Sequence, residues 1–312
     1  MHKFRAMNAF FFTAGLPELF RRSAMNWFIY VENKLSRFRP DSELSALNRS
    51  NGQPFTASSL LYNVVSEANL HYQQTEGLFS PYLGAALCEL GYSRSFETLT
   101  VPSKTVTASC NAEGIGPRPA GLNQELQRIT LEPGISVDLG GFAKGWSAHR
   151  FALKLQQQAI SPGAIGAGGD ISLWGTPREG WHIGIADPWQ EERDMLKLHL
   201  HGTLGIATSS SLKRQWTDTD GKIVHHIIDP RRGTPSDSDL AQVSVLAPNL
   251  PEAEVCAKCV LILGVEEGTR WLHDRYPLSA MIGVKHDRSI VVSGTLDHYN
   301  AAKGDTPYEL IS

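Results

Sequence analysis

VDLGGFAKG, at residues 137–145, is the segment from which the architecture of this chain is most readily inferred. Apolar residues over 136–139 predict a β-strand, and the double glycine at 140–141 predicts a tight turn. The residues that follow favour a helix over 142–157. The segment therefore predicts a strand that turns sharply into a helix.

A strand-to-helix turn of this kind suits a phosphate group. Free backbone N–H groups and a partial positive charge are exposed at the start of a helix, and glycine lets a ligand come close to the backbone. Lys144 would offset phosphate charge, and Asp138 would accept a hydrogen bond from the ligand. A tight turn beside a solvated lysine is the alternative, since the glycine spacing matches neither a dinucleotide fingerprint nor a Walker loop.

Composition places the chain among ordinary globular proteins, and we expect a single domain over residues 1–312 with 41% hydrophobic residues to fill its core. A net charge of -3 and the lack of a long Lys/Arg run argue against a nucleic-acid partner. No run of eighteen apolar residues predicts a membrane span. The apolar stretch around Phe10–Phe12 is short for a signal peptide and four cysteines are few for a disulfide scaffold, so a cytoplasmic location is expected.

Hydrophobic periodicity predicts helices and strands in alternation, hence an α+β or mixed α/β fold. Beside the helix already named, helical spacing of apolar residues favours residues 24–35, 58–75, 253–263 and 265–275. Strands are predicted at 98–101, 127–131, 136–139, 181–186, 196–200, 243–246 and 289–292. Polar, turn-rich or Gly/Pro-rich composition indicates loops at 36–48 and 102–121. The pair Cys256-x-x-Cys259 is interpreted as two thiols on a helix, because no second pair completes a zinc site.

Three further motifs carry weaker signals. The glycine cluster GAGGDI at 166–171 allows close approach by a ligand, although a loop that needs positive φ is the commoner reason for it. Hydroxyl groups in ATSSS at 207–211, with Lys213 and Arg214 close behind, suit a phosphate or a structural turn. His226 precedes an apolar pair and a Pro-containing turn, where an imidazole serves proton transfer or a purely structural role.

Taken in order, these motifs resemble those of the FAD:protein FMN transferase family, the ApbE-type flavin transferases. Seven or more motifs in the right order are a specific signal, and the resemblance covers nearly the whole chain. Its segments are FRAM at 4–7, SRF at 36–38, DSELS at 41–45 with Asn48, TEGLF at 75–79, LGY at 90–92, DLGGFAKG at 138–145, GGDI at 168–171, IGIADP at 183–188, ATS at 207–209 and HIIDP at 226–230.

The resemblance implies an ApbE-like fold with mixed sheets and flanking helices. It implies transfer of FMN from FAD to a Ser or Thr hydroxyl of an acceptor flavoprotein, with release of AMP. His226 would transfer a proton near the acceptor hydroxyl, with Thr208 as the second catalytic residue. The residues implied to line the FAD site are Met7, Phe38, Gly91, Tyr92, Asp138, Lys144 and Ile227.

The resemblance also implies a Mg²⁺ ion, held by the backbone carbonyl of Gly141 and by side chains on a late helix. Here the chain departs from the family pattern. The family has Asp and, four residues later, Thr, whereas this chain has Glu254 and Lys258. A protonated lysine cannot be a metal ligand, and an ammonium at about 4 Å from a divalent ion costs about 8 kcal/mol at an effective dielectric constant of about 20.

Two arrangements of the late helix follow from this departure. Either Lys258 turns away and leaves Glu254 to Mg²⁺, or the two form an i,i+4 pair whose internal cation replaces the metal. Ser80, where the family often has Asp, removes another carboxylate. Two alternatives to transfer therefore stay open: a degenerate protein that binds FAD without transferring FMN, and hydrolysis of the FAD pyrophosphate to FMN and AMP.

Overall fold

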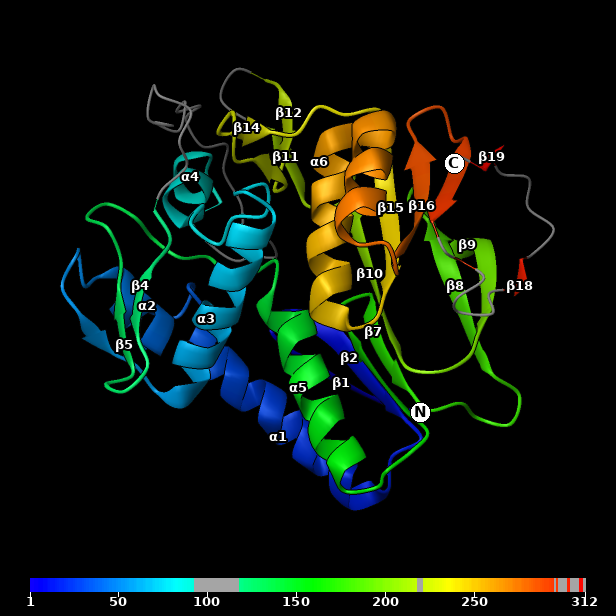
Figure 1. Cartoon of the computed structure of the whole chain (residues 1–312), viewed down its shortest axis with the longest axis horizontal. Coiled ribbons are helices and arrows are strands. Elements are labelled where there is room, and N and C mark those ends of the chain that lie inside the picture. The colour runs from blue at the N-terminus through cyan, green and yellow to red at the C-terminus, as the bar shows by residue number, and fades with distance from the viewer. Residues whose placement is uncertain (93–117, 218–220, 295, 297–301, 304–308, 311–312) are drawn as a thin grey trace.

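The computed structural model describes residues 1–92, 118–217, 221–294, 296, 302–303 and 309–310 (Figure 1). The predicted strand at 98–101, most of the predicted loop at 102–121 and Cys110 lie outside these residues.

A nine-stranded sheet is the central layer of the fold (Figure 1), and its strand order is β1-β2-β6-β7-β10-β15-β16-β17-β19. Neighbouring strands are antiparallel except for the parallel pair β17 and β19. The strands are β1 (His2–Ala6), β2 (Ala9–Ala14), β6 (Gly163–Ala167), β7 (Asp170–Trp174), β10 (Leu204–Ser210), β15 (Leu240–Ala247), β16 (Ala280–Lys285), β17 (Ile290–Gly294) and β19 (Glu309–Leu310). The predicted combination of helices and strands is therefore confirmed.

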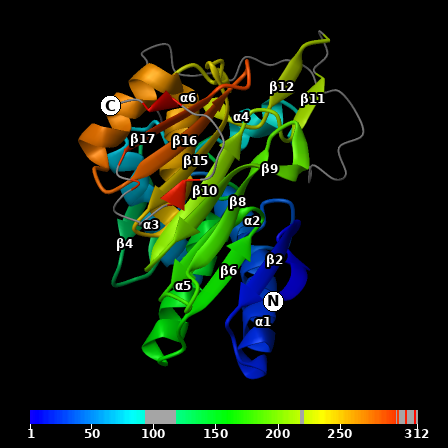
Figure 2. The same cartoon turned by 90° about the vertical axis from the view of Figure 1, so that its right-hand side faces the viewer.

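The two faces of this sheet are covered differently. Side chains alternate between the faces of a strand, so Val291 of β17 packs toward the helices while Ile290 and Val292 pack toward a second sheet. That second sheet has the order β18-β9-β8 and lies on the near side in Figure 2. The helices on the first face are α1 (Glu18–Leu35), α5 (Ala143–Gln157) and α6 (Leu250–Arg275), and the strands of the second sheet are β8 (Trp181–Asp187), β9 (Gln190–Leu200) and β18 (Ala302–Lys303).

The remaining elements lie on the left and at the top of Figure 1. The helices are α2 (Glu43–Asn48), α3 (Ser59–Gln74) and α4 (Gly84–Glu89). A three-stranded sheet has the order β3-β5-β4, and two further strand pairs are β11-β12 and β13-β14. Their bounds are β3 (Phe55–Thr56), β4 (Gly121–Asn123), β5 (Arg128–Thr130), β11 (Gln215–Thr217), β12 (Ile223–His225), β13 (Ile228–Asp229) and β14 (Thr234–Pro235).

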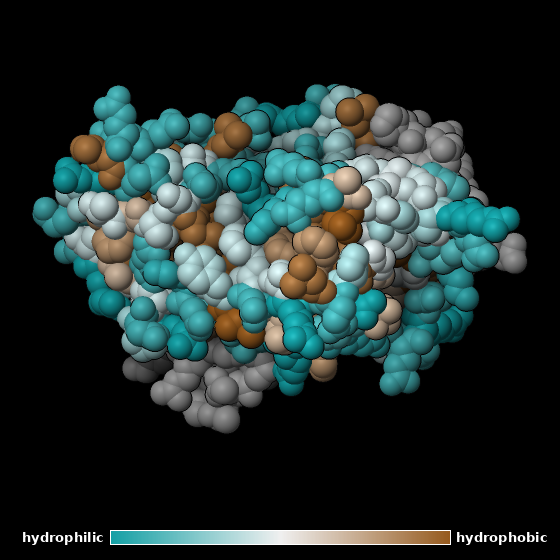
Figure 3. All heavy atoms as spheres, turned by 90° about the horizontal axis from the view of Figure 1, so that it is seen from below, coloured by the Kyte–Doolittle hydropathy of each residue, from teal (hydrophilic) through white to brown (hydrophobic). Residues whose placement is uncertain are grey.

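No helix in the described part of the chain is long and apolar enough to cross a membrane. Seen from below, the surface is mostly hydrophilic, with apolar side chains in small separate groups (Figure 3).

Helical periodicity located the long helices correctly. The predictions at 24–35, 58–75 and 142–157 correspond to α1, α3 and α5. The two predicted late helices are the two halves of α6, which is interrupted at Gly264 with φ 81° and ψ -177°. The prediction of a loop over 36–48 is wrong at its end, because the Ser42 hydroxyl accepts a hydrogen bond from the Ser45 N–H and begins the short helix α2.

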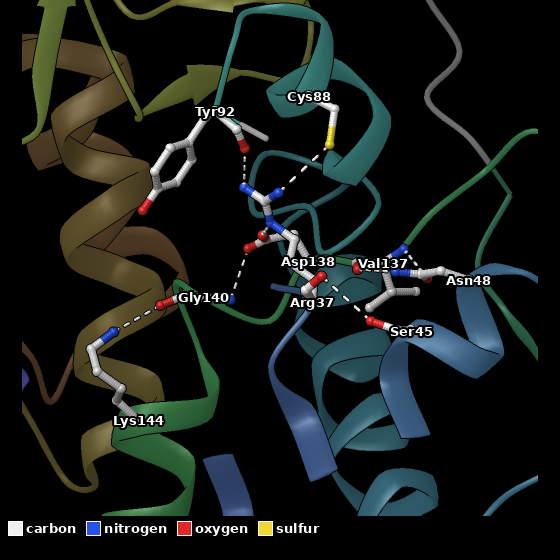
Figure 4. Close-up of polar contacts among 9 residues, drawn as sticks. All are labelled: Arg37, Ser45, Asn48, Cys88, Tyr92, Val137, Asp138, Gly140 and Lys144. Carbon is white, nitrogen blue, oxygen red and sulfur yellow. Dashed lines mark hydrogen bonds and ion pairs between the residues drawn. The ribbon is translucent and has the colours of Figure 1, made fainter. Parts of the chain in front are cut away.

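The predicted strand at 136–139 is wrong, because these residues join no sheet. The side-chain amide of Asn48 takes the place of a neighbouring strand: its Oδ1 accepts from the Val137 N–H at 2.8 Å, and its Nδ2 donates to the Val137 carbonyl at 2.9 Å (Figure 4). The Asp138 N–H in turn donates to the Pro81 carbonyl at 2.8 Å. An extended segment thus satisfies its backbone groups without a ladder.

Replacing Asn48 with alanine is expected to lower the free energy of unfolding by about 2–6 kcal/mol, because two backbone groups lose these partners at about 1–3 kcal/mol each. Urea denaturation measures the difference. Asn63, exposed on α3, provides the matched control, and its replacement with alanine is expected to change stability by at most about 0.5 kcal/mol. Equal effects of the two substitutions would contradict the anchoring role of Asn48.

Candidate functional site

One cavity, with a volume of about 270 Å³, brings together nearly all of the residues singled out in the sequence. It opens between the turn after β1, the segment after α1, the turn before α5, strand β10 and the helix α6. Of the predicted residues, its lining includes Met7, Phe38, Tyr92, Asp138, Gly141, Lys144, Thr208, His226, Ile227, Glu254 and Lys258. Gly91 does not line it.

Two tight turns bring Met7 and Tyr92 to the cavity. Met7 and Asn8 both have positive φ and form the two-residue turn between β1 and β2. The Met7 N–H donates to the Glu32 carboxylate at 2.7 Å, which ties this turn to α1. Gly91, at φ 92°, ends α4, and the Tyr92 N–H then bonds back to the Leu87 carbonyl. Gly91 therefore acts on the site by directing Tyr92.

The turn from Asp138 to Lys144 holds its own polar groups. Asp138 Oδ1 accepts from the Gly140 N–H at 2.8 Å, and Lys144 folds back so that Nζ donates to the Gly140 carbonyl at 2.7 Å (Figure 4). The Gly145 N–H donates to Glu254 Oε2 at 3.2 Å. The prediction of free N–H groups at this helix start is thus wrong for Gly140 and Gly145, because carboxylates of the protein accept from both.

A cluster of four charged groups lies beside this turn. Glu254, 3% exposed, has its Oε1 at 3.7 Å from Lys258 Nζ and at 4.0 Å from Lys144 Nζ. Asp170, at the start of β7, accepts from the Thr208 N–H at 2.9 Å. Burial, followed by the nearby Glu254 carboxylate, raises the pKa of Asp170 to about 7. Burial lowers the pKa of Lys144, and the Glu254 carboxylate opposes that shift.

Lys258 forms the i,i+4 pair with Glu254, which is the second of the two arrangements considered from the sequence. Its Nζ also lies 3.4 Å from the Glu254 carbonyl oxygen. The side chain passes over Gly141, where an added Cβ would lie only 2.4 Å from Lys258 Cε. In the described part of the chain, no cluster of three or more His, Cys, Asp or Glu side chains is placed to hold a metal. The Lys258 ammonium, 3.7 Å from Glu254 Oε1, is the feature that does not fit a Mg²⁺ ion at Glu254.

His226 borders the cavity with an imidazole that is kept neutral. Its Nδ1 is buried and has no hydrogen-bond partner within the described residues. Burial, and then the nearby cations beginning with Arg214, hold the pKa of His226 well below its usual value. Its neighbour His225 is a structural residue, since its Nε2 lies 3.0 Å from the Ser236 carbonyl and its Nδ1 accepts from the Ile227 N–H. A neutral imidazole at His226 is able to accept a proton near pH 7.

Thr208 is held in place on β10 by two neighbouring strands. Its hydroxyl lies 2.8 Å from the Ser244 hydroxyl of β15, and its N–H is bonded to Asp170 of β7. The first contact orients the side chain and the second holds the backbone, at the wall of the cavity.

Arg37 is a site residue that the sequence did not single out. Its side chain is 7% exposed, and its Nε donates to Asp138 Oδ2 (Figure 4). Nη2 donates to the Tyr92 carbonyl at 2.6 Å, and the guanidinium carbon lies 4.3 Å from the centre of the Phe38 ring. Arg37 thus joins Asp138 to both predicted aromatic residues. The available signal was its position directly before Phe38, but an arginine at that position is equally consistent with a solvated surface charge.

The predicted Cys256–Cys259 thiols lie on one helix, as expected. Both are free and buried. Burial raises the pKa of each, so neither is a reactive thiolate near neutral pH.

Comparison with known proteins gives a consistent result. The model of the ApbE family matches residues 8–282. An FAD:protein FMN transferase of Vibrio cholerae is 30% identical over 249 residues, which cover 76% of this chain and 71% of that protein. An FAD:protein FMN transferase of Treponema pallidum is 27% identical over 281 residues, covering 85% of this chain and 77% of that protein.

Solved structures show the same fold. The ApbE protein from Thermotoga maritima superimposes with a TM-score of 0.81 at 21% identity, over 93% of this chain and 95% of that one. The flavin transferase ApbE from Vibrio cholerae superimposes with a TM-score of 0.77 at 25% identity, over 96% of this chain and 98% of that one.

Proposed function

This chain belongs to the ApbE family, and we propose on that basis that it is an FAD:protein FMN transferase. It moves FMN from FAD to a Ser or Thr hydroxyl of an acceptor flavoprotein. The observation that carries the proposal is the cavity in which the turn at Asp138, the ammonium of Lys144 and the imidazole of His226 meet.

The lining of the cavity supports binding of FAD along its length. Met7, Phe38, Tyr92 and Ile227 offer apolar and aromatic surface to the ring systems. Lys144 offers a partly buried ammonium to the pyrophosphate, which is an anion. Asp138, already held by Arg37 and Gly140, is left in a fixed orientation to accept from a ligand N–H or hydroxyl.

Transfer exchanges one phosphorus–oxygen bond for another. The acceptor hydroxyl oxygen attacks the phosphorus of the FMN half, and the bond from that phosphorus to the bridging oxygen breaks. AMP leaves with that oxygen, and the acceptor becomes an FMN phosphoester. The hydroxyl proton passes to the imidazole of His226, which its lowered pKa keeps unprotonated before the step. Thr208, fixed by Ser244 and Asp170, is assigned to the position of the reacting phosphate.

Two finer points belong to the same proposal. The free thiols of Cys256 and Cys259 support a reducing location such as the cytoplasm. We give Mg²⁺ no part in the steps above, because Glu254, where the resemblance implies a metal ligand, is paired with Lys258.

The test is to incubate the protein with FAD and an acceptor that the Vibrio cholerae relative modifies, and to measure AMP release together with the mass of the acceptor. We expect AMP and an FMN adduct in equal amounts, and no adduct when the acceptor Ser or Thr is replaced with alanine. AMP without adduct, also in the absence of acceptor, would identify a hydrolase. Bound FAD with neither product would identify a carrier and overturn the proposal.

A further inference from the structure

We infer that the Lys258 ammonium serves as a built-in cation for the FAD pyrophosphate, so that this chain binds and cleaves FAD without a divalent metal ion. The inference rests on the proposed function, since it concerns the same cavity. The two proposals can be tested separately, because the metal dependence of FAD binding can be measured without any transfer of FMN.

The position of Lys258 supports this role. Its side chain crosses Gly141, the residue whose carbonyl was expected to face a metal, and Lys258 lines the cavity together with Lys144. Its Nζ is fixed by contacts with both the side chain and the backbone carbonyl of Glu254. Lysine carries a compact point charge, and Lys258 presents it at the wall of the cavity.

The carboxylate of the site is already neutralised without a metal. Glu254 is the most buried carboxylate of the cluster, and each of its oxygens has a partner: Oε1 faces Lys144 and Lys258, and Oε2 accepts from the Gly145 N–H. A Mg²⁺ ion is held by one or two carboxylates and keeps several waters around it, whereas the Oε1 atom of Glu254 already faces two ammonium groups. Arg214 adds a further cation to the cavity lining. The surplus is positive, which suits the anionic pyrophosphate and disfavours a second cation.

The electrostatic cost of a metal here is large. A divalent ion beside Glu254 Oε1 is repelled by two ammonium groups at once, because Lys144 Nζ lies 4.0 Å and Lys258 Nζ 3.7 Å from that oxygen. Lys258 instead stabilises the negative charge that moves onto the AMP oxygen when the phosphorus–oxygen bond breaks. No co-reactant beyond FAD and the acceptor hydroxyl is needed for this step.

The first experiment measures FAD affinity, by quenching of flavin fluorescence, in EDTA and in a saturating excess of MgCl₂. We expect the two affinities to agree within about twofold, because a ligand that does not bind the protein cannot shift its equilibrium. Calorimetric titration of Mg²⁺ alone is expected to show no binding. AMP release in the presence of acceptor is expected at the same rate in EDTA and in Mg²⁺.

The Lys258→Thr variant reverses this behaviour. It removes the internal cation and leaves Glu254 Oε1 with Lys144 as its remaining ammonium neighbour. In EDTA we expect FAD affinity to fall by about 10- to 100-fold, the loss of one charge-assisted contact, and Mg²⁺ is expected to restore it. Lys258→Arg keeps the charge and is expected to remain independent of metal. Lys154→Thr, exposed on α5, is the matched control and should leave FAD affinity unchanged.

The outcomes separate the two proposals. A wild-type affinity that rises tenfold or more with Mg²⁺ overturns the inference and leaves the transferase function standing. A Lys258→Thr variant that is folded, as judged by urea denaturation, and still binds FAD in EDTA like the wild type overturns it as well. If the wild type binds FAD neither in EDTA nor in Mg²⁺, the proposed function is overturned and the inference with it.

Discussion

Replacing His226 with glutamine is expected to lower the rate of FMN transfer by about 100- to 10,000-fold, the usual contribution of a positioned general base. The affinity for FAD is expected to stay within about threefold of wild type, because glutamine keeps most of the side-chain volume at the cavity wall. Single-turnover measurement of adduct formation separates the chemical step from binding.

The control for this substitution is His182→Gln, since His182 is exposed on β8 and does not line the cavity. Its transfer rate is expected to equal that of the wild type. A His226→Gln variant that transfers FMN at more than about a third of the wild-type rate would remove His226 from the proton-transfer step, because a general base contributes far more than that.

The pH profile of the wild type provides an independent check on His226. An ordinary histidine is half-protonated at about pH 6.5, but burial and the surrounding cations lower the pKa of His226. Because the group loses its ability to accept a proton only below its own pKa, we expect no loss of transfer from His226 protonation between pH 8 and about pH 6.5. Acidic loss with a midpoint near the ordinary value, absent from His226→Gln, would contradict the lowered pKa.

Replacing Glu254 with alanine is expected to lower the free energy of unfolding by about 3–5 kcal/mol, the range for breaking a buried ion pair from one side. Lys144 and Lys258 would both lose the carboxylate that faces them, and the Gly145 N–H would lose its acceptor. Urea denaturation of the two proteins measures the difference.

The same helix offers a matched control in an exposed pair. Glu266 contacts Arg270 at 3.2 Å with the same i,i+4 spacing, but both side chains are largely exposed. Glu266→Ala is therefore expected to cost at most about 0.5 kcal/mol. If Glu254→Ala proved as mild as Glu266→Ala, Glu254 would not be the counter-ion that holds the two lysines in place.

Local patterns account for the helices that were predicted correctly, and their absence accounts for the strands that were missed. The C-terminal end of α1 and both ends of α3 follow from apolar spacing that is complete within each segment, whereas α1 begins at Glu18, six residues before its predicted start. Strand β6 has the sequence GAIGA, and glycine disfavours strands. Gly166 is needed there because it pairs with Phe12 of β2, whose ring would lie 2.0 Å from an added Cβ. That requirement is visible only when both strands are known.

The segment at 137–145 shows the same division. The tight turn at its two glycines and the start of α5 were predicted from neighbouring residues. Its place in the order of motifs helped to identify the family. The hydrogen-bond partner of its backbone was not predicted, because Asn48 lies 89 residues away in the chain and takes the place of a neighbouring strand. Arg37, the partner of Asp138, is separated from it by 101 residues.

The sequence by itself determined the family, the long helices and the identity of the chemical groups, because each of these depends on residue type at short spacing or on the order of motifs. Only the tertiary structure decided how those groups are paired. In the folded chain the Lys258 ammonium contacts Glu254, and the same carboxylate accepts from the Gly145 N–H, 109 residues away in the sequence. Burial keeps His226 neutral. Pairing and burial depend on distances in space, and these distances determine whether a lysine repels a metal or replaces it.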